Sequence, residues 1–586
     1  MSEARDKWVD GLLGQMNIEQ KIGQVLVFSF AGTHLTPDVV DLVKNHNLGG
    51  LRISQGFRGM NLMNDVKPGE EPDEAVMRSM HRPEGLNRDY AYMKPAAYCS
   101  MPQYARLLNS IRQLAMERPL GIPLHFTIDQ EGSGSDDLLF DACLFPHPMG
   151  LAATGDPQTA YRTAVAIGKQ ARAVGANMIH SPVLDVNTNP RNPEIGTRAY
   201  GDNPEIVTKF ALETLRGLQE TRLIATGKHF PGRGESVHDA HWGLPAVELS
   251  REELYEKHLA PYRALIDAGL PAVMTAHCLY PALGVNDAPA GATAHVINEL
   301  LRGEFGFQGV VTTDNMMMGG VLQKYELREA ILQYILAGND LVLLRDESPI
   351  RWRIMEYLRD AVGEGRLPEA RLDEACGRIL RMRWDMGLAQ NGGLVDDTEA
   401  ALSGRFDPDI RKEARDIAEK SVLLLRDEQN VLPLAKDKSV LVVEQVFPTH
   451  LASNTMDCHP GLLWDEVCRM TDKAGSVEIG NTPSESDIDR VRRRMHEADV
   501  IITTNYWYHK AASSITELVR EMQQTGKPVI VVANTPYEFS APADIQTVLT
   551  VFNPGSREHL RAAVGIIYGN LQATANCPVN VSPVDD

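Results

Sequence analysis

The 586-residue chain lacks the features of membrane-spanning, secreted and disulfide-rich proteins. Its apolar runs are all too short to cross a bilayer, so we expect no membrane-spanning helix. The opening residues, MSEARDKWVD, carry charges where a secretory signal has an apolar region. The seven cysteines are too few for a disulfide framework and form no CxxC pair of the kind found in zinc ribbons. Together these absences predict a cytoplasmic protein.

Positive charge is also scarce, because 58 lysines and arginines stand against 78 aspartates and glutamates, which gives a net charge of −20. Such a surface repels nucleic-acid phosphates and anionic lipid, so we expect neither a nucleic-acid nor a membrane partner. A small-molecule or oligosaccharide substrate fits this charge better. The same charge is also typical of proteins that are acidic only for solubility.

The first 390 residues alternate short apolar runs with amphipathic helical stretches, a pattern that predicts βαβ units and a parallel sheet. Eight such runs favour a (β/α)8 TIM-type barrel over an open sheet. The runs are Gln24–Phe28, Gly49–Ile53, Pro123–Ile128, Asn177–Val183, Leu223–Gly227, Ala272–Ala276, Gly309–Thr313 and Asp340–Leu344. Residues 56–101 contain no clear strand pattern and are interpreted as an insertion.

A second, smaller α/β domain is predicted after the barrel. A polar linker is expected at 391–415, with the barrel at 1–390 and an αβα sandwich at 416–586. A helical stretch at 409–419 leads into this domain. Its predicted open parallel sheet uses the runs Val422–Leu425, Ser439–Glu444, Asp499–Thr504, Pro528–Asn534 and Gln546–Phe552. No GxGxxG or P-loop motif lies in it, so nucleotide binding has no support.

Polar and ionisable residues follow the apolar runs of the predicted barrel. These residues are Asp129, Asp185, Lys228, His229, His277 and Asp314. In a barrel the carboxyl ends of all strands meet at one rim, where active sites lie. The sequence therefore predicts an active site at this rim.

The loop 227–245, GKHFPGRGESVHDAHWGLP, holds the densest set of such residues. Its D-x-H spacing lets Asp239 orient and polarise His241, which suits the histidine to both give and take a proton. An isolated D-x-H is also found simply capping backbone groups. A zinc site is the chemical rival, since His229, His238, Asp239 and His241 are all suitable ligand types.

Asp314 ends the run GFQGVVTTD at the same predicted rim. A carboxylate placed across a barrel mouth from an acid/base group is the arrangement that retaining glycoside hydrolysis requires. The adjacent methionines, Met316–Met318, are interpreted as wall packing.

These segments resemble glycoside hydrolase family 3, and most closely its NagZ-like β-N-acetylglucosaminidase branch. The resemblance runs along nearly the whole chain. It rests on LGQMNIEQKIGQ at 13–24, DQEG at 129–132, SPVLDVNTNPRNPEIGTRAYG at 181–201, KHFPG with Asp239 and His241, MTAHCLYPAL at 274–283, GFQGVVTTD at 306–314, KSVLLLRDEQNVLPL at 420–434 and NCPVNV at 576–581. The resemblance implies that the last of these is the closing strand of the second domain.

The resemblance also implies roles for individual residues. Asp314 matches the nucleophile, His241 the unusual histidine acid/base, and Asp239 its partner. The residues matching those that hold the sugar in the −1 subsite are Asp129, Arg198, Lys228 and His229. No cofactor or metal is implied.

The chain departs from the family pattern beside this site. After DQEG the family continues GRVxRL, whereas this chain reads SGSDD, so Asp137 stands where the family has a sugar-binding arginine. Arg233 replaces a usual histidine and Glu235 a usual aspartate. Three interpretations compete: Arg233 or an arginine from 52–58 replaces the lost one, the sugar carries a positive amino group that pairs with Asp137, or Asp136 and Asp137 point to solvent.

We therefore expect a retaining exo-β-glycosidase that hydrolyses terminal β-linked N-acetylglucosamine or a related amino sugar. The alternatives are a family 3 enzyme for a basic amino-sugar glycoconjugate, a metal-dependent barrel hydrolase and a non-catalytic sugar-binding protein. Phosphorolysis is a further hypothesis, since a neutral imidazole does not repel an incoming anion. The aglycone, the pathway and the oligomeric state are not assigned.

Overall fold

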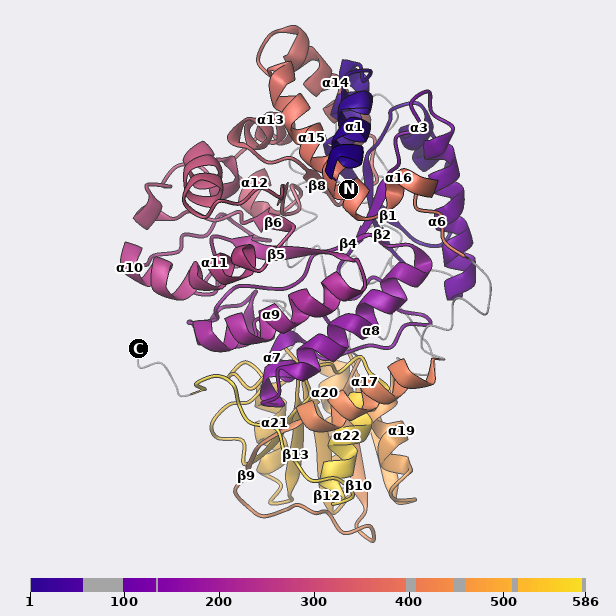
Figure 1. The fold of residues 1–586 in the computed structure, drawn as a ribbon. Helices are drawn as coiled ribbons and strands as arrows, with labels where there is room; N and C mark the ends of the chain where they lie inside the picture. Colours follow the sequence, from indigo (N-terminus) through magenta and orange to yellow (C-terminus); the bar gives the residue numbers. More distant parts are fainter. Residues whose placement is uncertain are drawn as a thin grey trace.

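The computed structural model describes residues 2–55, 98–132, 135–396, 407–446, 459–507 and 515–581. Most of the predicted insertion at 56–101 lies outside the described residues, as does Cys458. Within them the chain forms an eight-stranded sheet followed by a six-stranded one (Figure 1).

The eight-stranded sheet is the predicted barrel. Its strands are β1 Leu26–Ala31, β2 Gly50–Ser54, β3 His125–Ile128, β4 Met178–Ile179, β5 Ile224–Phe230, β6 Ala272–Thr275, β7 Val310–Thr313 and β8 Val342–Leu344. All neighbouring strands pair in parallel, and β8 pairs with β1. A parallel bridge between Thr312 and Leu341 closes the ring between β7 and β8. All eight predicted strands are confirmed.

Helices surround the barrel, and the longer ones bury an apolar face against it. The α-helices in the barrel part of the chain are α1 Ser2–Leu13, α2 Ile18–Gln24, α3 Pro37–Lys44, α6 Met101–Met116, α7 Pro148–Ala153, α8 Gln158–Val174, α9 Pro204–Glu220, α10 Arg251–Glu253, α11 Ala260–Asp267, α12 Gly319–Leu322, α13 Leu327–Ala337, α14 Ile350–Gly363, α15 Glu369–Asp385 and α16 Leu388–Asn391. Helical turns of π type at Leu254–His258 and Val296–Glu304 complete the ring.

Asp340, two residues before β8, ties separate parts of the barrel together. Its fully buried carboxylate pairs with the guanidinium groups of Arg302, Arg371 and Arg378 at 2.8, 3.0 and 2.9 Å. Its Oδ2 also accepts a hydrogen bond from the Val311 backbone N–H at 3.0 Å. This hub fixes β7 and β8 against the outer helices, at the end of the barrel opposite the predicted rim.

The six-stranded sheet has the order β11-β10-β12-β13-β14-β9. Its strands are β9 Leu423–Asp427, β10 Val440–Gln445, β11 Ala474–Ile479, β12 Val500–Asn505, β13 Val529–Ala533 and β14 Thr547–Thr550. Its helices are α17 Pro408–Ser421, α19 Leu462–Cys468, α20 Glu485–Arg494, α21 Thr516–Gln523 and α22 Arg557–Ile567. The end of the predicted linker is therefore helical, while the division into domains stays a prediction.

Three details of the smaller sheet differ from expectation. The sheet is mixed rather than wholly parallel, because β9 pairs antiparallel with β14. Strand β11 was not predicted, since half of its residues are only partly buried and it lacks an apolar run. The segment Asn576–Val581 is not a strand and lies against the barrel, where the Asn576 N–H donates to the Ala153 carbonyl at 2.8 Å.

The smaller sheet meets the barrel through α7 and the loops after β3 and β4 (Figure 1). The His147 N–H donates to the Phe552 carbonyl at 3.1 Å. The Asn187 amide donates to the Tyr537 hydroxyl at 2.8 Å, beyond the carboxyl end of β13. These contacts support the loop after β4, which carries Glu194 and Arg198 into the rim.

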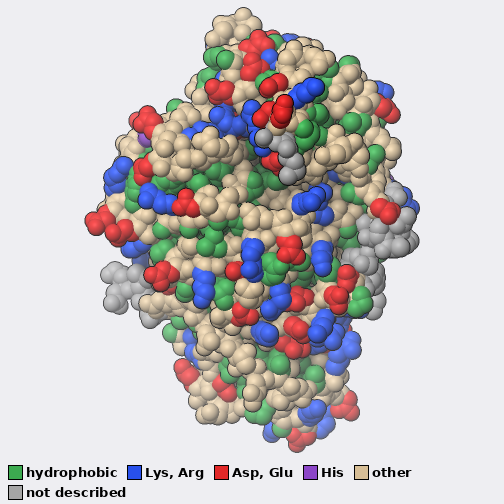
Figure 2. Space-filling view, viewed as in Figure 1, with side chains coloured by type: hydrophobic (Ala, Val, Ile, Leu, Met, Phe, Trp, Pro, Cys, Tyr) green, Lys and Arg blue, Asp and Glu red, His purple; other side chains and the backbone are tan. Residues whose placement is uncertain are grey.

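Figure 2 shows acidic and basic side chains interspersed over this face of both sheets, without a large area of one sign. Among the described residues, no helix combines the length and the apolar character needed to cross a membrane.

Candidate active site at the barrel rim

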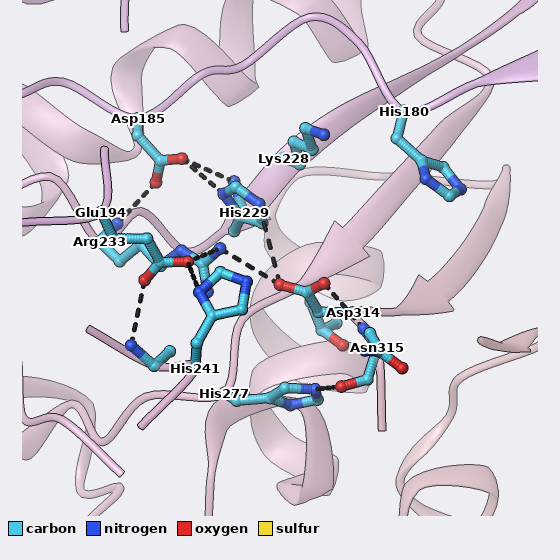
Figure 3. Close-up of polar contacts among 12 residues, drawn as sticks. His180, Asp185, Glu194, Lys228, His229, Arg233, His241, His277, Asp314 and Asn315 are labelled. Atoms are coloured by element: carbon cyan, nitrogen blue, oxygen red, sulfur yellow. Dashed lines mark hydrogen bonds and ion pairs between the residues drawn. The ribbon is translucent and has the colours of Figure 1, made fainter. Parts of the chain in front are cut away.

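The polar residues predicted at the rim do gather at the carboxyl ends of the barrel strands (Figure 3). Asp129 directly follows β3, Lys228 and His229 belong to the end of β5, and Asp314 directly follows β7. The hydrogen bonds and ion pairs described below connect them into two adjoining clusters, one around Asp314 and one around Asp129.

Asp314 lies in a positively charged surrounding. Its Oδ2 is 3.2 Å from the Arg233 guanidinium and 3.8 Å from Nε2 of His229. The Asn315 N–H donates to Oδ1 at 2.7 Å. Burial by itself raises the pKa of this carboxyl, but Arg233, together with His277 and His241, holds it below its usual value. Asp314 is therefore an ionised carboxylate at neutral pH, as a nucleophile must be.

His241 pairs with Asp239 in the way expected from the D-x-H spacing. Nδ1 of His241 lies 2.7 Å from Oδ1 of Asp239, which also accepts from the His241 backbone N–H at 2.8 Å. Burial lowers the pKa of the imidazole, but Asp239 and Glu194 outweigh it and raise the pKa above the usual value. The side chain is about one-third exposed, with relative accessibility of 34%, while Asp239 is buried. This leaves the imidazole reachable from the rim.

Glu194 joins these two groups and was not predicted as a site residue. Its Oε1 lies 2.6 Å from the Arg233 guanidinium and 3.4 Å from Nδ1 of His241. The same Nη2 atom of Arg233 reaches Asp314. Arg233, expected to hold a sugar, therefore lies between two carboxylates and contacts Asp314 directly (Figure 3).

The second cluster centres on Asp129 and Glu131. Lys228 Nζ lies 3.2 Å from Asp129 and also contacts Glu131. Arg198 binds Glu131 with two hydrogen bonds of 2.8 and 3.1 Å. Burial would raise the pKa of Glu131, but Arg198 and Lys228 lower it to about 2. Glu131 was not predicted individually, although it belongs to the DQEG segment.

His229 is held by Asp185 rather than pointing freely into the site. Its Nδ1 is 2.7 Å from Oδ2 of Asp185, and its Nε2 faces Asp314. Burial, Arg233 and other nearby cations keep the pKa of His229 well below its usual value. Burial raises the pKa of Asp185 to about 6. His229 is therefore neutral at physiological pH.

Asp137 is buried, which excludes the interpretation that it points to solvent. Its Oδ2 lies 3.0 Å from the Arg52 guanidinium and accepts the Asp129 N–H at 2.6 Å. Nη2 of Arg52 also lies 2.6 Å from Oδ2 of Asp129. Burial and the neighbouring Asp129 raise the pKa of Asp137. Two arginines were candidates to replace the missing sugar-binding arginine of the family. Arg52 lies beside Asp129, whereas Arg233 lies beside Asp314.

Comparison with known sequences decides the family, because residues 17–382 match the family described as glycosyl hydrolase family 3 N terminal domain. The chain belongs to glycosyl hydrolase family 3. The family is named for glycoside hydrolysis, the class of reaction that the rim geometry has to be compared with.

Individual family 3 relatives include N-acetylglucosaminidases. A β-N-acetylglucosaminidase/β-glucosidase of Cellulomonas fimi is 33% identical over 329 residues, which is 54% of this chain and 57% of that relative. The matched part of the chain thus spans little more than half of that relative's length. A β-hexosaminidase A of Pseudoalteromonas piscicida is 28% identical over 482 residues, 75% of this chain and 78% of the relative.

A solved structure of this family is also similar. The glycoside hydrolase family 3 β-N-acetylglucosaminidase from Paenibacillus sp. str. FPU-7 superposes with a TM-score of 0.82 at 28% identity. The superposition covers 97% of this chain and 99% of that one. The fold with its barrel and smaller mixed sheet is therefore the family 3 two-domain fold.

The family 3 chain brings together a different set of possible metal ligands from the one predicted. Among the described residues, Glu194, Asp239 and His241 form the one group of suitable atoms, all within 4.8 Å of one another. His229 instead pairs with Asp185, and His238 is exposed. The Arg233 guanidinium already lies 2.6 Å from Glu194, and a positive charge there opposes cation binding.

Proposed function

We propose that this family 3 enzyme is a retaining exo-β-N-acetylglucosaminidase that removes terminal β-linked N-acetylglucosamine or a related amino sugar. The observation that carries the proposal is that one barrel rim holds both Asp314, whose pKa Arg233 keeps low against the effect of burial, and His241, whose pKa Asp239 and Glu194 raise against the same effect. The N-acetylglucosaminidase and hexosaminidase relatives support the sugar. A cytoplasmic location stays a prediction from the sequence.

In the proposed reaction Asp314 and His241 act in two steps. The Asp314 carboxylate attacks the anomeric carbon while Nε2 of His241 gives its proton to the departing oxygen. This forms a glycosyl ester on Asp314. His241, now neutral, takes a proton from water, which attacks the anomeric carbon and releases the sugar with retained configuration. Asp239 holds Nδ1 throughout, which keeps Nε2 turned toward the substrate.

The Asp129 cluster is suited to holding the sugar in the −1 subsite. The side chains of Asp129 and Arg198 retain 16% and 14% relative accessibility, so their polar atoms are within reach of sugar hydroxyls. Lys228 is buried beneath them and orients both Asp129 and Glu131. Charge-assisted hydrogen bonds of this kind strengthen as the oxocarbenium-like transition state forms.

The test is turnover of aryl β-glycosides by wild-type protein, Asp314→Asn and Asp267→Asn. The sugars are N-acetylglucosamine, glucosamine, glucose, N-acetylgalactosamine and xylose. We expect preference for the N-acetylglucosaminide, a loss of about 10⁴-fold or more in Asp314→Asn, and no change in Asp267→Asn, an exposed aspartate at the end of α11. Preference for the glucosaminide alone would instead favour a basic amino-sugar substrate.

Two further measurements separate the remaining alternatives. Activity lost in chelator and restored by zinc would support the metal-dependent hydrolase and contradict the role given to His241. A sugar 1-phosphate formed when phosphate is present would show phosphorolysis. Amino-sugar binding without any turnover would support a non-catalytic binding protein.

A further inference from the structure

Glu194 occupies a position in the rim that the proposed reaction does not yet use. It lies in the loop after β4 and is buried, with 5% relative accessibility. Its backbone N–H donates to Oδ1 of Asn192 at 2.9 Å, and its Oε2 accepts the Ala240 N–H at 3.1 Å. The Asn192 amide donates to the Arg233 carbonyl at 2.8 Å. The Glu194 carboxylate is thus bound directly to the acid/base loop at Ala240, and the Glu194 backbone is tied to the same loop through Asn192.

The contacts of Glu194 form a continuous line between the two reacting groups. Asp239 contacts His241, His241 faces Oε1 of Glu194 at 3.4 Å, and that oxygen pairs with Arg233 at 2.6 Å. Nη2 of Arg233 then reaches Asp314 at 3.2 Å. Figure 3 shows the Glu194 carboxylate next to both the His241 imidazole and the Arg233 guanidinium, with Arg233 in turn linked to Asp314.

We propose that Glu194 is a positioning residue that holds His241 and Arg233 at the same time and thereby couples the protonation of the acid/base to that of the nucleophile. This inference rests on the proposed function, because it concerns the same two reacting groups. Glu194 itself is not expected to touch the substrate.

The direction of the coupling follows from the charges around each group. His241 faces Asp239, Glu194, Arg233, Asp314 and neutral His229, whereas Asp314 faces Arg233, His229, His241 and His277. Removing the negative charge of Glu194 leaves the Arg233 charge uncompensated, so both His241 and Asp314 release their protons at lower pH. Removing the positive charge of Arg233 has the opposite effect on both groups.

The experiment compares the pH dependence of kcat/KM in Glu194→Gln, Arg233→Gln and the double variant. We expect Glu194→Gln to move both limbs of the profile toward acid by about 1 pH unit, and Arg233→Gln to move both toward alkali. The double variant should lie closer to wild type than either single variant. Glu235→Gln is the matched control, since Glu235 lies in the same loop and bonds to Thr188, and its limbs should not move.

A second measurement does not depend on activity. Titration of the His241 ring by NMR, in protein labelled at histidine Cε1 and assigned with His241→Gln, should show the same acid shift in Glu194→Gln. If wild type turns over no glycoside, the proposed function fails while this titration still tests the coupling. If Glu194→Gln does not fold, Glu194→Asp serves instead, because it retracts the carboxylate while keeping its charge and should give a smaller shift of the same sign. The inference would be overturned if neither the limbs of the kcat/KM profile nor the His241 titration moved in Glu194→Gln. It would also be overturned if the two limbs moved in opposite directions.

Discussion

Arg52 is the residue whose removal best tests how this chain tolerates an aspartate in place of the family's sugar-binding arginine. Its Nη2 atom lies 2.6 Å from Asp129 and 3.0 Å from Asp137, and the side chain is only 4% accessible. Arg52→Met would leave the buried carboxylate of Asp137 and the partly buried carboxylate of Asp129 without their shared cation. Breaking a buried ion pair in this way costs about 3–5 kcal/mol of folding free energy.

The same substitution should weaken sugar binding. Burial opposes the charge on Asp129, and Lys228 and Arg52 are the main groups that keep its pKa low, so loss of Arg52 raises that pKa. A weakened charge-assisted contact of about 1.5–3 kcal/mol corresponds to a fall in kcat/KM of roughly 10- to 150-fold. Urea denaturation followed by tryptophan fluorescence gives the stability, and hydrolysis of the aryl N-acetylglucosaminide gives the kinetic change.

Asp137→Asn is the matched variant. An asparagine oxygen can still accept the Asp129 N–H, and Arg52 keeps its contact with Asp129. We expect a smaller loss of stability and a change in kcat/KM of about 5-fold or less, equivalent to about 1 kcal/mol. A fall in kcat/KM as large as that of Arg52→Met, at unchanged stability, would refute the reasoning. It would mean that Asp137 contacts the substrate, as the amino-sugar interpretation requires.

Two further predictions concern the acid/base pair and the barrel. Asp239→Asn should lower kcat by about 10²- to 10⁴-fold and move the alkaline limb of the pH–rate profile to lower pH, since Asp239 raises the pKa of His241 and the protonated imidazole is needed for the first step. An unmoved limb would contradict this. Asp340→Asn should destabilise the fold by about 3–5 kcal/mol in urea denaturation, because its three arginines lose their shared partner. A cost below about 1 kcal/mol would show that solvent already screens the hub.

The barrel was predictable because its strands are short apolar runs separated by amphipathic helices. Strands buried on both faces are mostly apolar, as in β8 with its sequence VLL. The same rule misses β11, because half of the residues in this edge strand of the smaller sheet are only partly buried and its sequence, AGSVEI, contains no apolar run. An apolar run also does not show whether a strand pairs parallel or antiparallel with its neighbour. The antiparallel pairing of β9 with β14 could therefore not be predicted from the apolar residues of β9.

The site was predictable only where a residue directly follows a strand or belongs to a recognisable motif. Asp129, His229 and Asp314 satisfy this condition. Glu194 belongs to the segment 181–201, but the resemblance implies no role for it, because it lies well beyond β4 in an irregular loop and meets Arg233 only after the barrel has closed. Arg52 lies within the apolar run of β2, and its charge is explained only by the two carboxylates that face it.

The order of charges across the rim is what distinguishes the two reacting groups. Asp314 has cationic Arg233 as its nearest charged neighbour, which favours the ionised carboxylate. His241 has carboxylates on both sides of Nδ1, which favours the protonated imidazole. Groups whose surroundings shift their pKa values in opposite directions are suited to opposite roles in one reaction. Exchanging the charges of Glu194 and Arg233 would leave the net charge unchanged, yet it would protonate the nucleophile more readily and deprotonate the acid. The proposed roles therefore depend on this local sequence of charges and not on the overall acidity of the chain.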